Sequence, residues 1–154
     1  VARWQDTAPT SVLFTVGDAG AVNQTGDSIM GFLFSEKQGF SKCGTYTSNG
    51  SATDGPFIYT GFRPAYTMIK MTNGSNPWVI DDNTRSPYNV MKNTLQADNT
   101  NAEVTGYGID YLSNGFKIYT NDSSYNGSAT NTFIYMAFAE APFVNSEGVP
   151  CNAR

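Results

Sequence analysis

The sequence predicts an all-β protein, an antiparallel β-sandwich of the jelly-roll or lectin-like type with hairpins and long surface loops. Its apolar residues fall in short runs rich in Ile, Val, Phe, Tyr and Thr, and helical periodicity is nearly absent. Asn-Gly, a strong signal for a tight hairpin turn, occurs four times. Aromatic residues make up 14% of the chain, which is enough to fill a core.

Nine runs are expected to form strands. The clearest is 132–140, whose alternating side chains are apolar on both faces, so we expect a central strand that is covered on both sides. Asn73-Gly74 and Asn114-Gly115 are each flanked by two runs, which predicts two hairpins with type I′ turns. The nine runs are 11–16, 28–35, 44–47, 55–60, 66–72, 78–82, 109–112, 115–120 and 132–140.

A strand-and-turn pattern occurs twice and suggests the domain organisation. A Phe-containing strand, an Asn turn and an aromatic strand precede Glu36, and the same order precedes Glu140. If this is a duplication, residues 1–43 are the terminal hairpin of a preceding repeat unit packed on the main domain, and 44–144 form a complete β-sandwich unit. Residues 145–154 are then a C-terminal tail. The alternative is that two unrelated hairpins look alike.

The distribution of charged and apolar residues limits the classes of partner that are expected. The formal net charge is −4 and Lys and Arg form no run, so no nucleic-acid partner is expected. No apolar stretch approaches the roughly 18 residues of a membrane span, so no membrane insertion is expected. Cys43 and Cys151 are expected to be two thiols, with a disulfide between them as the alternative.

The residue types give little support to catalysis. The chain has no histidine, which removes the usual hydrolase triads and most zinc chemistry. Asp81 and Asp82 are adjacent on an expected strand and point to opposite faces, so a strand-end turn is favoured over a calcium site. Glu36 and Glu140 are expected to end strands or pair with an Arg such as Arg63, rather than to form a glycosidase dyad. No catalytic residue, metal site or cofactor is predicted.

Five Asn-x-Ser/Thr sequons are present, and three of them coincide with Asn-Gly turns. The turn interpretation explains those three without glycosylation. The sequons begin at Asn23, Asn49, Asn73, Asn121 and Asn126.

Exposed aromatic side chains are the better functional lead. The segment 83–105 has weak patterning and is predicted to be a long surface loop, the kind of element that often carries function. Tyr88 in this loop and Tyr125 in another turn are expected at the surface, where a ring can stack on a sugar or anchor an interface. Trp4 and Trp78 also lie near turns, although Trp78 is expected to belong to the core. The predicted ligand-binding residues are Tyr88, Asn89, Asn99, Asn101 and Tyr125.

Several segments resemble a known family. They are GTYTSNGS at 44–51, DGPFIYTGFRPA at 54–65, LSNGFKI at 112–118 and YMAFAEAPF at 135–143. Together they resemble an uncharacterised β-rich domain found in tail-fibre-like and other structural proteins of marine tailed bacteriophages, often next to a lectin-like domain. One departure is Cys43, which stands where an aromatic residue is expected.

The resemblance implies a non-catalytic virion structural module on the surface of the extracellular particle. Its expected function is that of a tail-fibre or appendage domain that binds a host-surface glycan or protein receptor. The alternative is capsid decoration or virion assembly without receptor binding, and a polysaccharide depolymerase is poorly supported. Expected partners are other virion proteins and further copies of the chain, with a homotrimer favoured. The resemblance transfers no catalytic or binding residues.

Overall fold

The computed structural model describes residues 7–141 and divides the chain into two units. The first unit ends at Phe34 and the second begins at Ser35. The boundary expected at Cys43 falls inside a strand of the second unit, β1 (Ser41–Thr47). Trp4, Cys151 and the tail 145–154 lie outside the described residues. Among the helices of residues 7–141, none has the length and apolarity needed to span a membrane.

The first unit contains one short helix, α1 (Gly20–Asn23), and no strand between residues 7 and 34. The strands expected at 11–16 and 28–35 are therefore wrong, and the supposed repeat has no counterpart of the last strand. A strand forms only where a neighbouring backbone binds its N–H and C=O groups. Here the Thr10 hydroxyl accepts hydrogen bonds from the N–H groups of Val12 and Leu13 at 3.3 and 2.9 Å, which closes a local turn instead.

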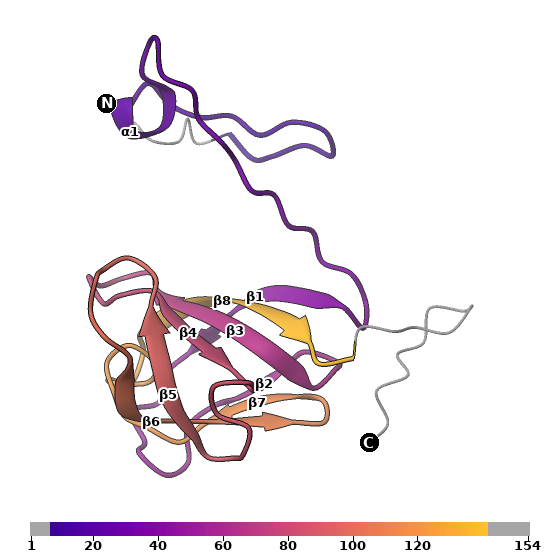
Figure 1. Ribbon diagram of the computed structural model, residues 1–154, viewed down its shortest axis with the longest axis vertical. Helices are drawn as coiled ribbons and strands as arrows, with labels where there is room; N and C mark the ends of the chain where they lie inside the picture. The colour runs from indigo at the N-terminus through magenta and orange to yellow at the C-terminus, as the bar shows by residue number, and fades with distance from the viewer. Residues whose placement is uncertain (1–6, 142–154) are drawn as a thin grey trace. The chain divides into compact units, whose positions relative to one another are not determined.

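The second unit is built on one antiparallel sheet of eight strands (Figure 1). Their order across the sheet is β1-β8-β3-β4-β5-β6-β7-β2, so the predicted all-β antiparallel class is confirmed. Seven of the strands cover runs expected from the sequence. The remaining bounds are β2 (Phe57–Tyr59), β3 (Pro64–Met71), β4 (Val79–Asp82), β5 (Met91–Gln96), β6 (Val104–Leu112), β7 (Gly115–Ile118) and β8 (Thr132–Ala139).

The sheet folds over on itself, so that its two halves enclose one core. The ring of Tyr46 on β1 stacks on Phe133 of β8 at 5.0 Å between centroids. Phe116 of β7, from the other half, packs edge-on against Tyr46 at 6.5 Å and against Tyr135 of β8 at 5.4 Å. Because residues of the first and last thirds of the sheet meet in this way, the fold is a β-sandwich that approaches a closed barrel.

Strand β8 is central, as expected, but only one of its faces is fully covered. It pairs with β1 on one side and β3 on the other. Phe133, Tyr135 and Ala137 point into the core and are buried. The alternate residue Ile134 is 36% exposed, which corrects the expectation of burial on both faces. A sandwich packs one face of each sheet, so the outer apolar residues stay half-covered.

The two predicted hairpins are present, but neither has the predicted type I′ turn at its Asn-Gly pair, because neither Gly74 nor Gly115 has a positive φ. The loop with Asn73-Gly74 is also longer than a two-residue turn, since β3 ends at Met71 and β4 begins at Val79. Strands β3 and β4 pair, and β6 pairs with β7. Leu112 pairs directly with Gly115, so Ser113 and Asn114 form the turn and Gly115 belongs to the strand without a positive φ. A Cβ on Gly115 would lie 2.1 Å from the carbonyl oxygen of Ile58 on β2. This glycine is needed for the close approach of β2 and not for a type I′ turn.

The long loop predicted at 83–105 contains an additional strand, β5. Its pattern was weak in the sequence because Thr94, a polar residue, occupies a fully buried inward position. A register shift between Met91 and Asn93 also interrupts the alternation. The predicted loop therefore consists of two shorter loops, 83–90 and 97–103, at opposite ends of β5.

Asn126 connects two loops from inside the second unit. Its side chain is 0% exposed. The Oδ1 atom accepts hydrogen bonds from the N–H groups of Asn49 and Gly50 at 2.8 and 3.3 Å. The Nδ2 group donates to the Asn49 Oδ1 atom at 2.9 Å and to the Ser51 carbonyl at 2.8 Å. This burial leaves no room for a glycan at Asn126, whose amide instead completes the backbone hydrogen bonds of the 49–51 turn.

We expect Asn126→Ala to lower the free energy of unfolding by about 2–4 kcal/mol, because it leaves buried backbone groups without partners. Urea denaturation measures the change. Asn121→Ala, at an exposed sequon, is the matched control and should change stability by less than about 0.5 kcal/mol. Equal, small effects of both substitutions would show that the Asn126 contacts do not stabilise the fold.

Candidate functional site

The outer surface of β2, β7 and β6 carries the most exposed aromatic side chains of the sheet. Along these strands, Ile58 and Phe116 point into the core and are 5% and 0% exposed. Successive side chains of a strand point to opposite faces, so their neighbours point to solvent. We call this surface the aromatic face and define it by Phe57, Tyr59, Asp110, Lys117 and Tyr119.

Strand register places these five residues side by side. Phe57 of β2 pairs with Lys117 of β7, and Lys117 pairs in turn with Asp110 of β6. Tyr59 follows Phe57 by two residues and is 65% exposed, whereas Phe57 is 45% exposed. The Lys117 ammonium lies 5.5 Å from the centre of the Tyr119 ring. Rings and charged groups thus alternate over three neighbouring strands.

The two charged residues of the aromatic face, Lys117 and Asp110, differ in their contacts. The Lys117 Nζ atom donates a hydrogen bond to the Asp54 Oδ1 atom at 2.7 Å, which lowers the pKa of Asp54 and raises the pKa of Lys117. Asp110 is half-buried, and desolvation raises its pKa. Its Oδ1 atom is buried and accepts no hydrogen bond within the described part of the chain.

A cleft of about 470 Å³ adjoins the aromatic face. Its size falls within the range of roughly 300–1,000 Å³ for small-molecule sites. Glu36 and Lys42 form an ion pair of 3.3 Å at the cleft, and Glu36 also accepts a hydrogen bond from the Cys43 N–H at 3.1 Å. Tyr59 belongs to both the cleft and the aromatic face. The cleft is lined by Glu36, Lys37, Gln38, Gly39, Ser41, Lys42, Tyr59, Thr60 and Gly61.

Tyr88 and Asn89, two of the predicted ligand-binding residues, come shortly before β5, and Asn89 contacts β6. Tyr88 is 83% exposed, as predicted. The Asn89 carboxamide donates to the carbonyl of Tyr111 at 3.0 Å and accepts from its N–H at 3.1 Å, so the side chain takes the place of a strand residue. Val90 follows, and its side chain lies against Gly108 of β6. The 88–90 segment therefore borders the strand that carries Asp110.

Asn99 and Asn101 lie in the loop at the other end of β5. Their Nδ2 groups donate to the Gln96 Oε1 atom at 2.7 and 2.9 Å. Because the six residues of β5 span about 20 Å, the two Asn residues are far from Tyr88 and Asn89. The structure does not assemble the predicted residues into one site. Trp78, expected in the core, is half-buried and directly precedes β4.

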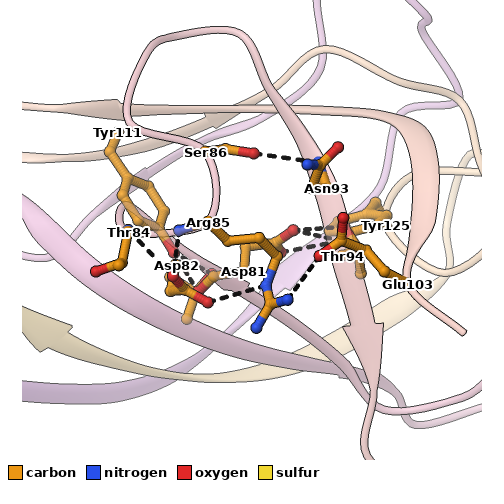
Figure 2. Close-up of polar contacts among 11 residues, drawn as sticks. Asp81, Asp82, Thr84, Arg85, Ser86, Asn93, Thr94, Glu103, Tyr111 and Tyr125 are labelled. Carbon is orange, nitrogen blue, oxygen red and sulfur yellow. Dashed lines mark hydrogen bonds and ion pairs between the residues drawn. The ribbon is translucent and has the colours of Figure 1, made fainter.

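Tyr125 is not a surface residue, which corrects the prediction. Its side chain is 0% exposed, and its hydroxyl lies 2.9 Å from both carboxyl oxygens of Asp81 (Figure 2). The surrounding Ser and Asn residues suggested a solvated turn. A tyrosine ring can be buried where its hydroxyl finds a polar partner, and here that partner is a buried acid on β4.

Asp81 is the centre of a polar network inside the core. It is 1% exposed, and burial raises its pKa to about 7. The Thr94 hydroxyl donates to the Asp81 Oδ1 atom at 2.6 Å and lies 2.8 Å from the Tyr125 hydroxyl. Asp81, Thr94 and Tyr125 make three contacts with one another, and a hydrogen bond in each contact needs one proton. The hydroxyl groups of Thr94 and Tyr125 supply only two protons. A protonated Asp81 supplies the third, which agrees with its raised pKa.

Asp82, the next residue, points outward and organises the 83–90 loop. Its Oδ1 atom accepts hydrogen bonds from the N–H groups of Thr84 and Arg85 at 3.1 and 2.7 Å. The Arg85 guanidinium bridges Asp82 and Glu103 at 3.1 and 2.6 Å, which ties the loop to the start of β6 (Figure 2). The predicted strand-end turn at these aspartates is present.

Glu36 and Glu140 each take part in an ion pair with a different basic residue. Glu140 forms an ion pair with Arg63 at 3.2 Å, as the sequence suggested, while Glu36 binds Lys42. Within residues 7–141, His, Cys, Asp and Glu side chains form no group that could hold a metal ion. What the described surface offers chemically is rings, hydrogen-bonding groups and a cleft, all suited to non-covalent binding.

The alternation of residues in two segments of the sequence indicates the aromatic face. Phe57-Ile58-Tyr59 and Lys117-Ile118-Tyr119 have the same alternation, with Ile between two residues that point the other way. Two such strands next to each other place their outer residues on one surface.

The raised pKa of Asp81 predicts that stability falls as the pH rises. A carboxyl with a folded-state pKa of about 7 and an unfolded value of about 3.9 binds more protons in the folded state. The free energy of unfolding should therefore be highest below about pH 4 and drop by on the order of 4 kcal/mol by pH 7 through this group. Urea denaturation from pH 4 to pH 8 measures it.

Asp81→Asn should flatten that pH dependence, because an amide keeps an acceptor and a donor for Thr94 and Tyr125 without titrating. Asp27→Asn, at an exposed position, is the control and should leave the slope unchanged. A slope that survives in Asp81→Asn would assign the pH dependence to other groups.

The comparisons with known proteins identify the chain only at the level of a family. No curated protein and no solved structure matches it. One family model does match, over residues 1–142, and its description is a domain of unknown function, DUF7483. Since this match spans almost the whole sequence and includes the aromatic face and the cleft, the chain belongs to the DUF7483 family.

Proposed function

We propose that this chain is a non-catalytic binding module of a virion appendage, such as a tail fibre, and that it recognises a glycan on the host surface. The observation that carries the proposal is Tyr59, an exposed ring shared by the aromatic face and the charged cleft. In this proposal the module is carried on the outside of the particle, among other virion proteins and further copies of itself.

The chemistry of the aromatic face suits a sugar polymer. Phe57 and Tyr59 are two residues apart on one strand, so they lie about 7 Å apart along it. Flat rings of this kind can stack on the apolar C–H faces of sugar rings. Asp110 and Lys117 lie in the same row and can bind hydroxyl groups. A chain of sugars could follow the rings and end in the polar cleft beside Tyr59.

The composition and the resemblance support the same assignment. Charged residues make up 14% of the chain, against about 25% in a typical soluble protein, and the chain has no histidine for acid–base chemistry. The sequence resembles domains of phage structural proteins along most of its length. The alternative is an assembly or capsid-decoration role, in which the aromatic face would contact another virion protein, since such rings are also common in protein interfaces.

We expect Tyr59→Ala to weaken binding to host cells by about tenfold, because loss of one stacked ring costs about 1–1.5 kcal/mol. Phe57→Ala together with Tyr59→Ala should abolish measurable binding. Whole-cell binding and a glycan array, both with the purified chain, measure the effect.

Ile134→Ala is the matched control, since Ile134 is an exposed apolar residue on a different face. It should bind as the native chain does. Binding that survives the double substitution but is lost in Tyr88→Ala would move the site to the 83–90 loop. Binding to protease-treated but not glycan-stripped cells is expected for a glycan receptor, and the reverse would indicate a protein receptor. No binding to any host surface would favour the assembly role.

A further inference from the structure

The first unit exposes an unusual amount of apolar side chain for its length. Eight large apolar residues between residues 12 and 34 are each at least 46% exposed. The highest values are 82% for Val12, 79% for Met30 and 78% for Phe32. Isolated exposed apolar residues are ordinary, but eight within such a short segment are typical of an interaction surface. They are Val12, Leu13, Phe14, Ile29, Met30, Phe32, Leu33 and Phe34.

This segment has almost no interior of its own. Of residues 7–34, only Gly17 and Ala19 are buried, and neither brings a large side chain. Ordering a backbone costs about 1–2 kcal/mol per residue, which a segment without a core cannot recover from its own contacts. Its apolar residues can offset that cost only when another surface covers them.

The exposed residues are arranged so that one partner can cover them together. A Cβ on Gly31 would lie 3.7 Å from the Cζ atom of Phe14, so the 12–14 run lies beside the 29–34 run. Eight side chains that expose roughly 100 Å² each present on the order of 800 Å², which is the area that each partner contributes to a stable protein–protein interface.

The chemistry of the two runs favours a second copy of the same chain. Neither run contains a charged residue, and the segment from residue 7 to 34 contains Asp18 and Asp27 but no Lys or Arg. Two copies can therefore bury these runs against each other without burying a charge. An anionic lipid surface would need basic residues instead. With no strand in residues 7–34, the backbone of one copy can also pair with the same segment of another.

We propose that residues 12–14 and 29–34 form a self-association surface, and that its occupant is the same segment of a second copy of the chain. This surface belongs to the first unit, whereas the aromatic face belongs to the second. One oligomer then contains several aromatic faces. If these bind glycans, as in the proposed function, they can bind the same host surface at several points at once.

The test is the mass of the full chain in solution, measured by sedimentation equilibrium over a range of concentrations. The native chain should associate. Phe32→Asp combined with Leu33→Asp should be monomeric, with at least a hundredfold weaker association, since two charges would have to be buried in the interface. Tyr88→Asp, at an equally exposed aromatic residue of the second unit, is the matched control and should associate as the native chain does.

A native chain that stays monomeric at every concentration would overturn the proposal, as would an unchanged mass of the double variant. Far-UV circular dichroism checks that the sheet is intact in each variant. A second measurement does not depend on the charged variants: a benzophenone amino acid in place of Leu33 should give covalent dimers on irradiation. Cross-links only to the same chain would also contradict a second copy as the occupant.

Discussion

The second unit depends on a group of polar side chains buried where its sheet turns from one half to the other. The ladder between β4 and β5 is short, with only Val79 paired to Gln96 and Ile80 to Leu95. At this point the Asp81 side chain binds Thr94 of β5, so a side-chain contact reinforces the weak backbone connection. A buried polar group with satisfied hydrogen bonds holds one geometry, because every alternative leaves it without partners.

A second chain of hydrogen bonds crosses the core at the same place. The Tyr111 hydroxyl, from β6, donates to the carbonyl of Asp81 at 2.9 Å and lies 2.8 Å from the Thr67 hydroxyl of β3. Strands from both halves of the sheet are thereby connected through β4. Tyr111 of β6 is held by these hydrogen bonds, and Asp110, the residue before it on the strand, points to the opposite face. The strands that carry the aromatic face therefore have their inner side chains packed in the core, with Ile58 and Phe116 5% and 0% exposed.

The sequence was sufficient to predict what depends on alternation and turns. The antiparallel class, seven of the eight strands and two hairpins follow from runs of β-forming residues between Asn and Gly. It was insufficient where tertiary contacts decide the outcome. The strand β5 was not predicted because Thr94 is polar and its buried partner, Asp81, cannot be recognised from the sequence. Tyr125 was predicted to be exposed for the same reason, since it binds the same buried acid. Residues 28–34 have every local property of a strand, yet no neighbouring backbone pairs with them, and a single sequence cannot reveal that absence.

The hydrogen bonds of the Asn89 carboxamide determine which residues of the 83–90 loop can be substituted without loss of stability. By pairing with the backbone of Tyr111, one side chain anchors the loop that follows β4, and the adjacent Tyr88 contributes little to the packing. Replacing an exposed residue beside such an anchor alters the surface at small cost in stability. Substitutions at the tip of the loop can therefore change the exposed surface while the sheet stays the same.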